Sequence, residues 1–94
     1  MGALQAGNGM GAYAASKAGA HRLTEALAAE FKGRITVNAV LPSIIDTAAN
    51  RERMPKSDFA KWVRPKELAD VILFLASDAA SAVTGALLPV NGRV

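Results

Sequence analysis

The sequence predicts an α/β fold with two main helices and two short parallel strands. Helical spacing of apolar and small residues marks residues 12–32 and 64–77, whereas β-branched and apolar runs mark residues 34–41 and 86–90. The order helix, strand, loop, helix, strand favours a right-handed crossover, which places the two strands parallel in one sheet. A chain of 94 residues is one small domain or a part of a larger one.

Residues 1–11 contain several glycines and show little periodicity, so a loop is expected before the first helix. Its run GNGMG, at residues 7–11, is similar to a phosphate-binding glycine loop. A dinucleotide site would need a preceding strand and an acidic residue about 20 positions on, at a strand end. No strand fits before the run, and Glu30 falls inside a helix. An active-site loop is therefore the favoured interpretation.

Residues 12–32 form the strongest predicted helix, because alanine is abundant and is the best helix former. One face, which includes Ala15, carries small residues, and another, which includes Leu23, carries larger apolar ones. Gly33 is a natural residue to end this helix. The first strand is then expected at residues 34–41.

Pro42 should end that strand, and residues 43–64 are irregular and rich in charge, with a short helix expected at Ala48–Arg53. The second main helix has Pro65 in its first turn, where proline is tolerated. Its predicted buried stripe consists of Leu68, Val71, Ile72 and Leu75. The last strand, residues 86–90, leads into a turn.

Composition excludes several classes of function. There is no cysteine and a single histidine, His21, which is expected on a helix flank, so no metal site is predicted. Only two aromatic residues, Phe59 and Trp62, lie near the basic residues between 51 and 66, which is few for base stacking, so no nucleic-acid partner is expected. No apolar run reaches membrane-spanning length and no signal peptide begins the chain, which predicts a cytoplasmic protein without a membrane partner.

Tyr13 and Lys17 are the most informative pair of residues. At the start of a helix, four positions apart, they share one face and lie about 6 Å apart along the axis. A free phenol ionises only near about pH 10, and a nearby ammonium favours the phenolate. The pair is therefore a candidate proton donor and acceptor. The alternative is an ordinary helix-start aromatic beside a solvated lysine.

Three blocks of sequence in a specific order carry a family resemblance. They are YAASKAG at residues 13–19, VNAVLPSIIDT at residues 37–47, and the group FLASD, VTG and VNG between residues 74 and 92. Over essentially all 94 residues, the chain resembles the C-terminal part of the short-chain dehydrogenase/reductase family. The resemblance implies a C-terminal fragment of a Rossmann-type doubly wound parallel sheet, with residues 1–94 as a single partial domain. It also implies hydride transfer between carbonyl and alcohol with NAD or NADP.

The resemblance assigns a role to five residues. Tyr13 would be the general acid that protonates a carbonyl oxygen, and Lys17 would assist the phenol and bind the cofactor ribose. Thr47, with the backbone of Ile45, would hold the nicotinamide carboxamide, and Pro42 would shape that loop. Thr47 has a structural alternative as the N-cap of the short helix that follows it.

Departures from the family pattern bear on activity. The catalytic serine of the family would fall at or before Met1, and Ser16, beside the lysine, cannot replace it. The glycine-rich first turn and the ribose-selecting residue are also not found, so we expect this chain alone to bind neither NAD nor NADP. Ser43 stands where the family usually has glycine and would be strained at positive φ. Arg93 follows Gly92 where a second glycine is usual.

Three hypotheses therefore stay open. The chain is the C-terminal part of an oxidoreductase and is inactive in isolation, or it is a non-catalytic oligomerisation or interaction module derived from that fold. In the third, several copies or a separate N-terminal half rebuild a working site. A homo-oligomer, dimer or higher, is expected because the first strand lacks one neighbour and the alanine-rich helix face is bare.

Overall fold

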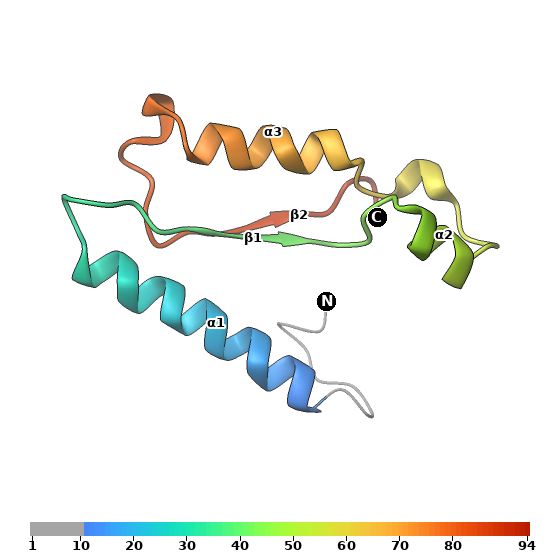
Figure 1. Ribbon diagram of the computed structural model, residues 1–94, viewed down its shortest axis with the longest axis horizontal. Helices are drawn as coiled ribbons and strands as arrows, with labels where there is room; N and C mark the ends of the chain where they lie inside the picture. The colour runs from blue at the N-terminus through green and yellow to red at the C-terminus, as the bar shows by residue number, and fades with distance from the viewer. Residues whose placement is uncertain (1–10) are drawn as a thin grey trace. The chain divides into compact units, whose positions relative to one another are not determined.

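The computed structural model describes residues 11–94 and shows an α/β arrangement (Figure 1). The element order is α1 (Gly11–Glu30), β1 (Ala39–Pro42), α2 (Ala48–Arg53), η1 (Phe59–Lys61), α3 (Pro65–Leu75), η2 (Asp78–Ala80) and β2 (Leu87–Val90), where η marks a short 3₁₀ helix. The predicted helices and strands are all present, and the short helix has the predicted bounds. The loop predicted at residues 1–11 lies outside the described residues, except for Gly11, which already belongs to α1.

Strands β1 and β2 pair in a two-stranded parallel sheet, and Figure 1 draws their arrows in the same direction. The backbone N–H of Ala39 donates to Ala86, and that of Ser43 donates to Val90. The backbone N–H groups of odd-numbered residues in β1 thus point toward β2. Pro42, which has no N–H, is even-numbered, so the pairing with β2 loses no hydrogen bond there. The predicted fold class is confirmed, although Pro42 is the last residue of the strand and not the first residue after it.

The first strand is shorter than predicted, and at residues 37 and 38 side chains share the pairing with one backbone bond, from the Gly85 N–H to the Val37 carbonyl at 2.8 Å. The N–H of Val37 donates to the Thr84 hydroxyl at 3.1 Å. The Asn38 side chain donates to the Val83 carbonyl and accepts from the Ala86 N–H, each at 3.0 Å. Polar side chains therefore satisfy the backbone before regular pairing begins.

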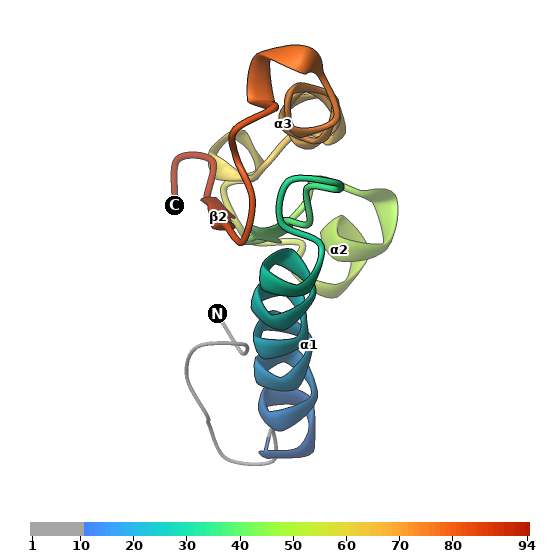
Figure 2. The same ribbon diagram turned by 90° about the vertical axis from the view of Figure 1, so that its left-hand side faces the viewer.

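The described chain divides into two compact units, of which the first holds residues 11–39 and 83–87. Helix α1 runs through it without interruption (Figure 2), and Gly33, at φ +84°, lies in the turn that follows the helix. Ala28 is buried, and a Cβ at Gly85 would lie 3.5 Å from the Ala28 methyl. His21, expected on a helix flank, is only 6% exposed.

The second unit, residues 40–82 and 88–94, has its buried core at Leu41, Trp62, Val63 and Ala80. Val63 is fully buried and forms a parallel bridge with Ile45. Gly92 has φ +66°, and a Cβ there would lie 2.9 Å from the Lys61 carbonyl oxygen. Glycine is therefore required where the C-terminal turn passes the segment at residues 61–63.

Helix α3 begins as predicted, with proline at its first position and the Glu67 carboxylate accepting from the Arg64 N–H at 2.9 Å. Three of the four predicted stripe residues are half-buried. The prediction for Ile72 is wrong, because its side chain is 48% exposed, and its neighbours Leu73 and Phe74 are exposed too. No element of the second unit covers that side of the helix. Helical spacing alone therefore overestimates how many of the apolar residues of α3 are buried.

Candidate functional site

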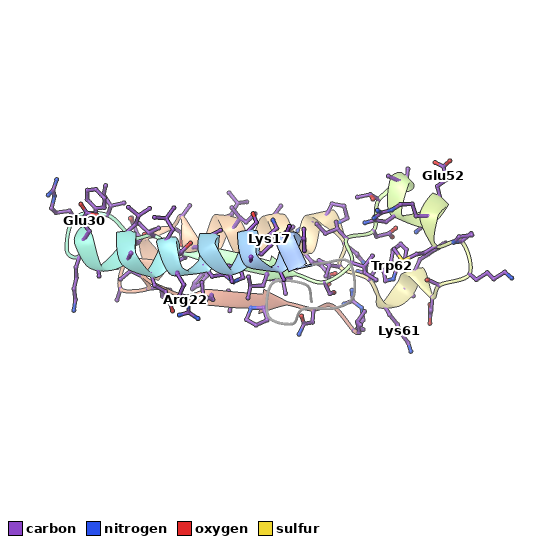
Figure 3. The ribbon with its side chains drawn as sticks, turned by 90° about the horizontal axis from the view of Figure 1, so that it is seen from below. Lys17, Arg22, Glu30, Glu52, Lys61 and Trp62 are labelled. Atoms are coloured by element: carbon purple, nitrogen blue, oxygen red, sulfur yellow. The ribbon has the colours of Figure 1, made fainter. Side chains whose placement is uncertain are left out.

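Tyr13 and Lys17 lie in the first turns of α1, and Figure 3 labels Lys17 on this helix. The Lys17 ammonium lies 5.7 Å from the centroid of the Tyr13 ring, within cation–π range. Tyr13 is 51% exposed, and Lys17 is exposed as well. The helix therefore brings the predicted pair together on an accessible face, with a cation beside the phenol.

The predicted nicotinamide-contacting residues, Pro42, Ile45 and Thr47, lie in the second unit, on and after the end of β1. Between them, Ser43 donates from its hydroxyl to the Asn91 carbonyl at 2.8 Å. Every positive φ in the described residues belongs to a glycine, so the strain expected for Ser43 is absent. Serine is accommodated here because its φ is not positive, and its hydroxyl in addition bonds the loop to the turn after β2.

Ile45 presents its peptide groups to an open edge. Its neighbours make the parallel bridge: Val63 donates to the Ile44 carbonyl at 2.9 Å, and Asp46 donates to the Val63 carbonyl at 2.7 Å. In a parallel pairing, the N–H and C=O of the residue between them point to the opposite side. There the Ile45 carbonyl accepts from the Asn50 side chain, and its N–H finds no acceptor within residues 11–94. Among the described residues, no group therefore occupies this N–H.

Thr47 adopts the structural role that the sequence left open. Its backbone is extended, at φ −125° and ψ 158°, and its hydroxyl oxygen accepts from the Asn50 N–H at 3.2 Å. It is thus the N-cap of α2. A hydroxyl that accepts as a cap still has its own proton to donate, so the N-cap role leaves ligand binding possible.

Sequence reasoning missed Asn50, Arg51 and Phe59. The Arg51 guanidinium donates to both oxygens of the Asp46 carboxylate, at 2.6 and 2.8 Å, and lies 4.5 Å from the Phe59 ring centroid. These hydrogen bonds from Arg51 lower the pKa of Asp46. Phe59 in turn contacts Trp62, with ring centroids 4.8 Å apart. The sequence offered one signal for the Asp46–Arg51 pair: an acidic residue just before a predicted short helix and a basic residue within it, five positions apart.

Arg93, which departs from the family pattern, connects several segments of the second unit by hydrogen bonds. Its guanidinium donates to both Glu67 oxygens, at 2.8 and 3.0 Å, and to the carbonyls of Ala60 and Trp62. Hydrogen bonds from Arg93 and from the Arg64 N–H lower the pKa of Glu67 to about 2. The C-terminal turn is thereby tied to the start of α3.

Within residues 11–94 no cluster of three or more His, Cys, Asp or Glu side chains is suited to a metal ion. Among the same residues, no helix is both long enough and apolar enough to cross a membrane.

A family model described as enoyl-(acyl carrier protein) reductase matches residues 1–92. This chain belongs to the short-chain dehydrogenase/reductase family. Galactitol 2-dehydrogenase of Rhizobium johnstonii is 46% identical over 91 residues, which cover 85% of this chain and 35% of that protein. The 3-oxoacyl-(acyl-carrier-protein) reductase of Pseudomonas aeruginosa is 47% identical over 90 residues, covering 85% and 36%.

A solved structure of a short-chain dehydrogenase/reductase, 4-hydroxyisoleucine dehydrogenase complexed with NADH, has a TM-score of 0.84 at 29% identity. That alignment covers 97% of this chain and 42% of the other. The likeness confirms a part of a Rossmann-type fold. The chain spans 35–42% of the length of these relatives.

Proposed function

We propose that this chain carries the proton-transfer pair and the nicotinamide-contacting loop of an NAD(P)-dependent carbonyl/alcohol oxidoreductase. The observation that carries the proposal is the Tyr13–Lys17 pair, with the ammonium 5.7 Å from the ring centroid on an exposed helix face. Family membership gives the pair its chemical context. In helices outside this family, a tyrosine and a lysine four positions apart do not by themselves indicate a catalytic site.

The residues of the second unit fit a nicotinamide carboxamide. The Ile45 N–H, which has no acceptor among residues 11–94, suits the amide oxygen, and the Ile45 carbonyl keeps a second lone pair for the amide NH₂. The Thr47 hydroxyl adds a donor next to them. Pro42 sets the direction of the chain as it leaves β1. Lys17 has three donors with which to hold a ribose hydroxyl.

The nicotinamide, when bound, supplies or takes up the hydride at the carbonyl carbon. Tyr13 supplies the proton: its hydroxyl proton goes to the carbonyl oxygen during reduction, and the phenolate takes a proton back from the alcohol during oxidation. Lys17 stabilises the phenolate that remains. A missing phenol would leave the developing alkoxide without a proton donor.

We expect that residues 1–94 act as a single partial domain and that the chain alone binds neither NAD nor NADP. The glycine-rich turn that holds pyrophosphate in such folds is not among its motifs. A fusion tests the proposal: residues 1–94 replace the matched 36% of the P. aeruginosa reductase. NADH- or NADPH-dependent reduction of a carbonyl substrate supports it. A folded fusion without turnover contradicts it.

A non-catalytic oligomerisation or interaction module is the second candidate, with exposed apolar side chains in its favour. Leu73 is 67% exposed on α3, beside Ile72 and Phe74 at 48% each. Each strand of the sheet also has one partner only among the described residues, which leaves an open edge on both sides. Sedimentation should therefore give a dimer or larger species at tens of micromolar. A monomer there contradicts the module and the expected homo-oligomer.

A further inference from the structure

Asn50 connects the two residues that are proposed to contact nicotinamide. Its backbone N–H donates to the Thr47 hydroxyl at 3.2 Å, and its side-chain Nδ2 donates to the Ile45 carbonyl at 2.8 Å. The side chain is itself held, since its Oδ1 accepts from Arg53 at 2.6 Å. One half-buried residue thus fixes the cap of α2 and the peptide that follows Ile45.

The bond to Ile45 matters because of the edge on which it is made. Val63 occupies the other side of the segment through Ile44 and Asp46. The Asn50 amide therefore reaches the same edge as the Ile45 N–H, which has no acceptor among residues 11–94. The Ile45 N–H shares a peptide plane with the Ile44 carbonyl, which Val63 holds, whereas Asn50 holds the Ile45 carbonyl.

A second anchor holds the start of the same helix. The Arg51 guanidinium is bonded to both Asp46 oxygens and lies against the Phe59 ring. Helix α2 can therefore not turn away from the loop without breaking the Asn50 and Arg51 contacts together. A bidentate guanidinium–carboxylate pair has a fixed geometry, which makes it suited to this positioning task.

Resting on the proposed function, we infer that Asn50 is a positioning residue for cofactor binding. Its side chain presets the Ile45 carbonyl and its backbone N–H presets the Thr47 hydroxyl before the nicotinamide arrives, so that less ordering is needed on binding. Asn50 does not touch the cofactor. Its contribution falls on the nicotinamide end and leaves the adenosine and phosphate end unaffected.

The variant Asn50→Asp tests this inference in the fusion with the P. aeruginosa reductase. It keeps the size of the side chain and the backbone N–H, but it loses both Nδ2 protons and sets a carboxylate against the Ile45 carbonyl. The matched control is Glu52→Gln, the reverse exchange on the same helix, where Glu52 points into solvent (Figure 3). The probes are NADH, by fluorescence titration, and ADP-ribose, which lacks the nicotinamide, by calorimetry.

Asn50→Asp should weaken NADH binding about tenfold and leave ADP-ribose binding unchanged, since one part-buried hydrogen bond is lost at the nicotinamide end only. Glu52→Gln should leave both unchanged. Equal losses for both probes, or no loss for NADH, would overturn the inference while the proposed function stands. If the parent fusion binds NADH no more tightly than ADP-ribose, the proposed function fails, and the inference fails with it.

A measurement on the 94-residue chain itself keeps the inference testable without cofactor. Amide order parameters of Asp46, whose N–H shares a peptide plane with the Ile45 carbonyl, and of Thr47 should be near about 0.85 in the parent, the value of rigid backbone, and should fall in Asn50→Asp. They should stay at the parent value in Glu52→Gln. Unchanged order in Asn50→Asp would show that Asn50 does not preset the loop.

Discussion

The start of α1 and the loop between β1 and α2 contribute to the proposed chemistry in different ways. Over residues 11–18 every side chain is exposed except the half-buried Ala14, and the Tyr13–Lys17 contact lies within the helix itself. Residues 43–47 are instead bonded to Asn50, Arg51, Val63 and the turn after β2. The chain thus fixes its proposed nicotinamide contacts through its own packing. It presents its proposed proton-transfer pair on a face that little else in the described chain supports.

The largest effect is expected at Tyr13, in the exposed start of α1. In a fusion that reduces a carbonyl substrate, Tyr13→Phe should lower turnover at least about a hundredfold, because the proton donor is lost. NADH affinity should stay at the parent value, since the hydroxyl of Tyr13 is not a proposed cofactor contact. Steady-state kinetics measures the turnover, and a binding titration measures the NADH affinity. Near-parent turnover would make the resemblance at residues 13–17 structural only.

The next effect compares the same substitution, glycine to alanine, in the two units. Gly92→Ala places a methyl 2.9 Å from the Lys61 carbonyl at φ +66°, and should lower the free energy of unfolding by about 2 kcal/mol. Gly19→Ala, in α1, meets nothing within 4 Å and should raise it by about 0.5–1 kcal/mol through helix propensity. Urea unfolding of the 94-residue chain measures both. Changes of the same sign would remove the contrast between a packed turn and an open helix.

A smaller effect is expected at the cap of α2. Thr47→Ala removes the oxygen that accepts from the Asn50 N–H and should cost about 1 kcal/mol of unfolding free energy. Thr47→Ser keeps a capping hydroxyl and should cost much less. Urea unfolding of the two variants beside the parent measures the difference. Equal stability of all three proteins would show that the cap adds nothing to the order of the loop.

The smallest effect concerns acid stability of the second unit. The pKa of Glu67 falls from 4.5 to about 2 on folding, so its contribution is present above pH 4.5 and is lost as pH falls toward about 2. The free energy of unfolding should therefore decline across this window, more steeply in the parent than in Glu67→Gln. Glu52→Gln should keep the parent slope, and 1 M salt should reduce the slope because the pair is partly exposed. Identical slopes for parent and Glu67→Gln would contradict a role for the Arg93 pair.

Much of the fold followed from local signals in the sequence. Proline at the first position of α3, the Gly33 turn and the short helix at Ala48–Arg53 are set by neighbouring residues, and these predictions are confirmed. The start of β1 was missed because Asn38 pairs with residues 45 or more positions away. Ile72 was misjudged because helical spacing shows which residues share a face, and only tertiary packing decides whether that face is covered.

The candidate site was predictable in part for the same reason. Tyr13 and Lys17 meet because one helix turn separates them, and Thr47 caps the helix that directly follows it. Asn50 was not found, because its bond to Ile45 depends on the bridge that Ile45 makes with Val63. Arg93 was noted only as a departure, and its bonds to Glu67 join residues 26 positions apart.

Amide hydrogen exchange of the 94-residue chain tests most directly the claim that the loop is fixed by its own contacts and the start of α1 is not. The amides of Asp46 and Val63, bonded across the bridge, should exchange at least about tenfold more slowly than those of residues 15–18, which open by local fraying. That result would show that the loop is more stable than the start of α1. Equal protection of the two regions, or faster exchange at Asp46 and Val63, would contradict the account.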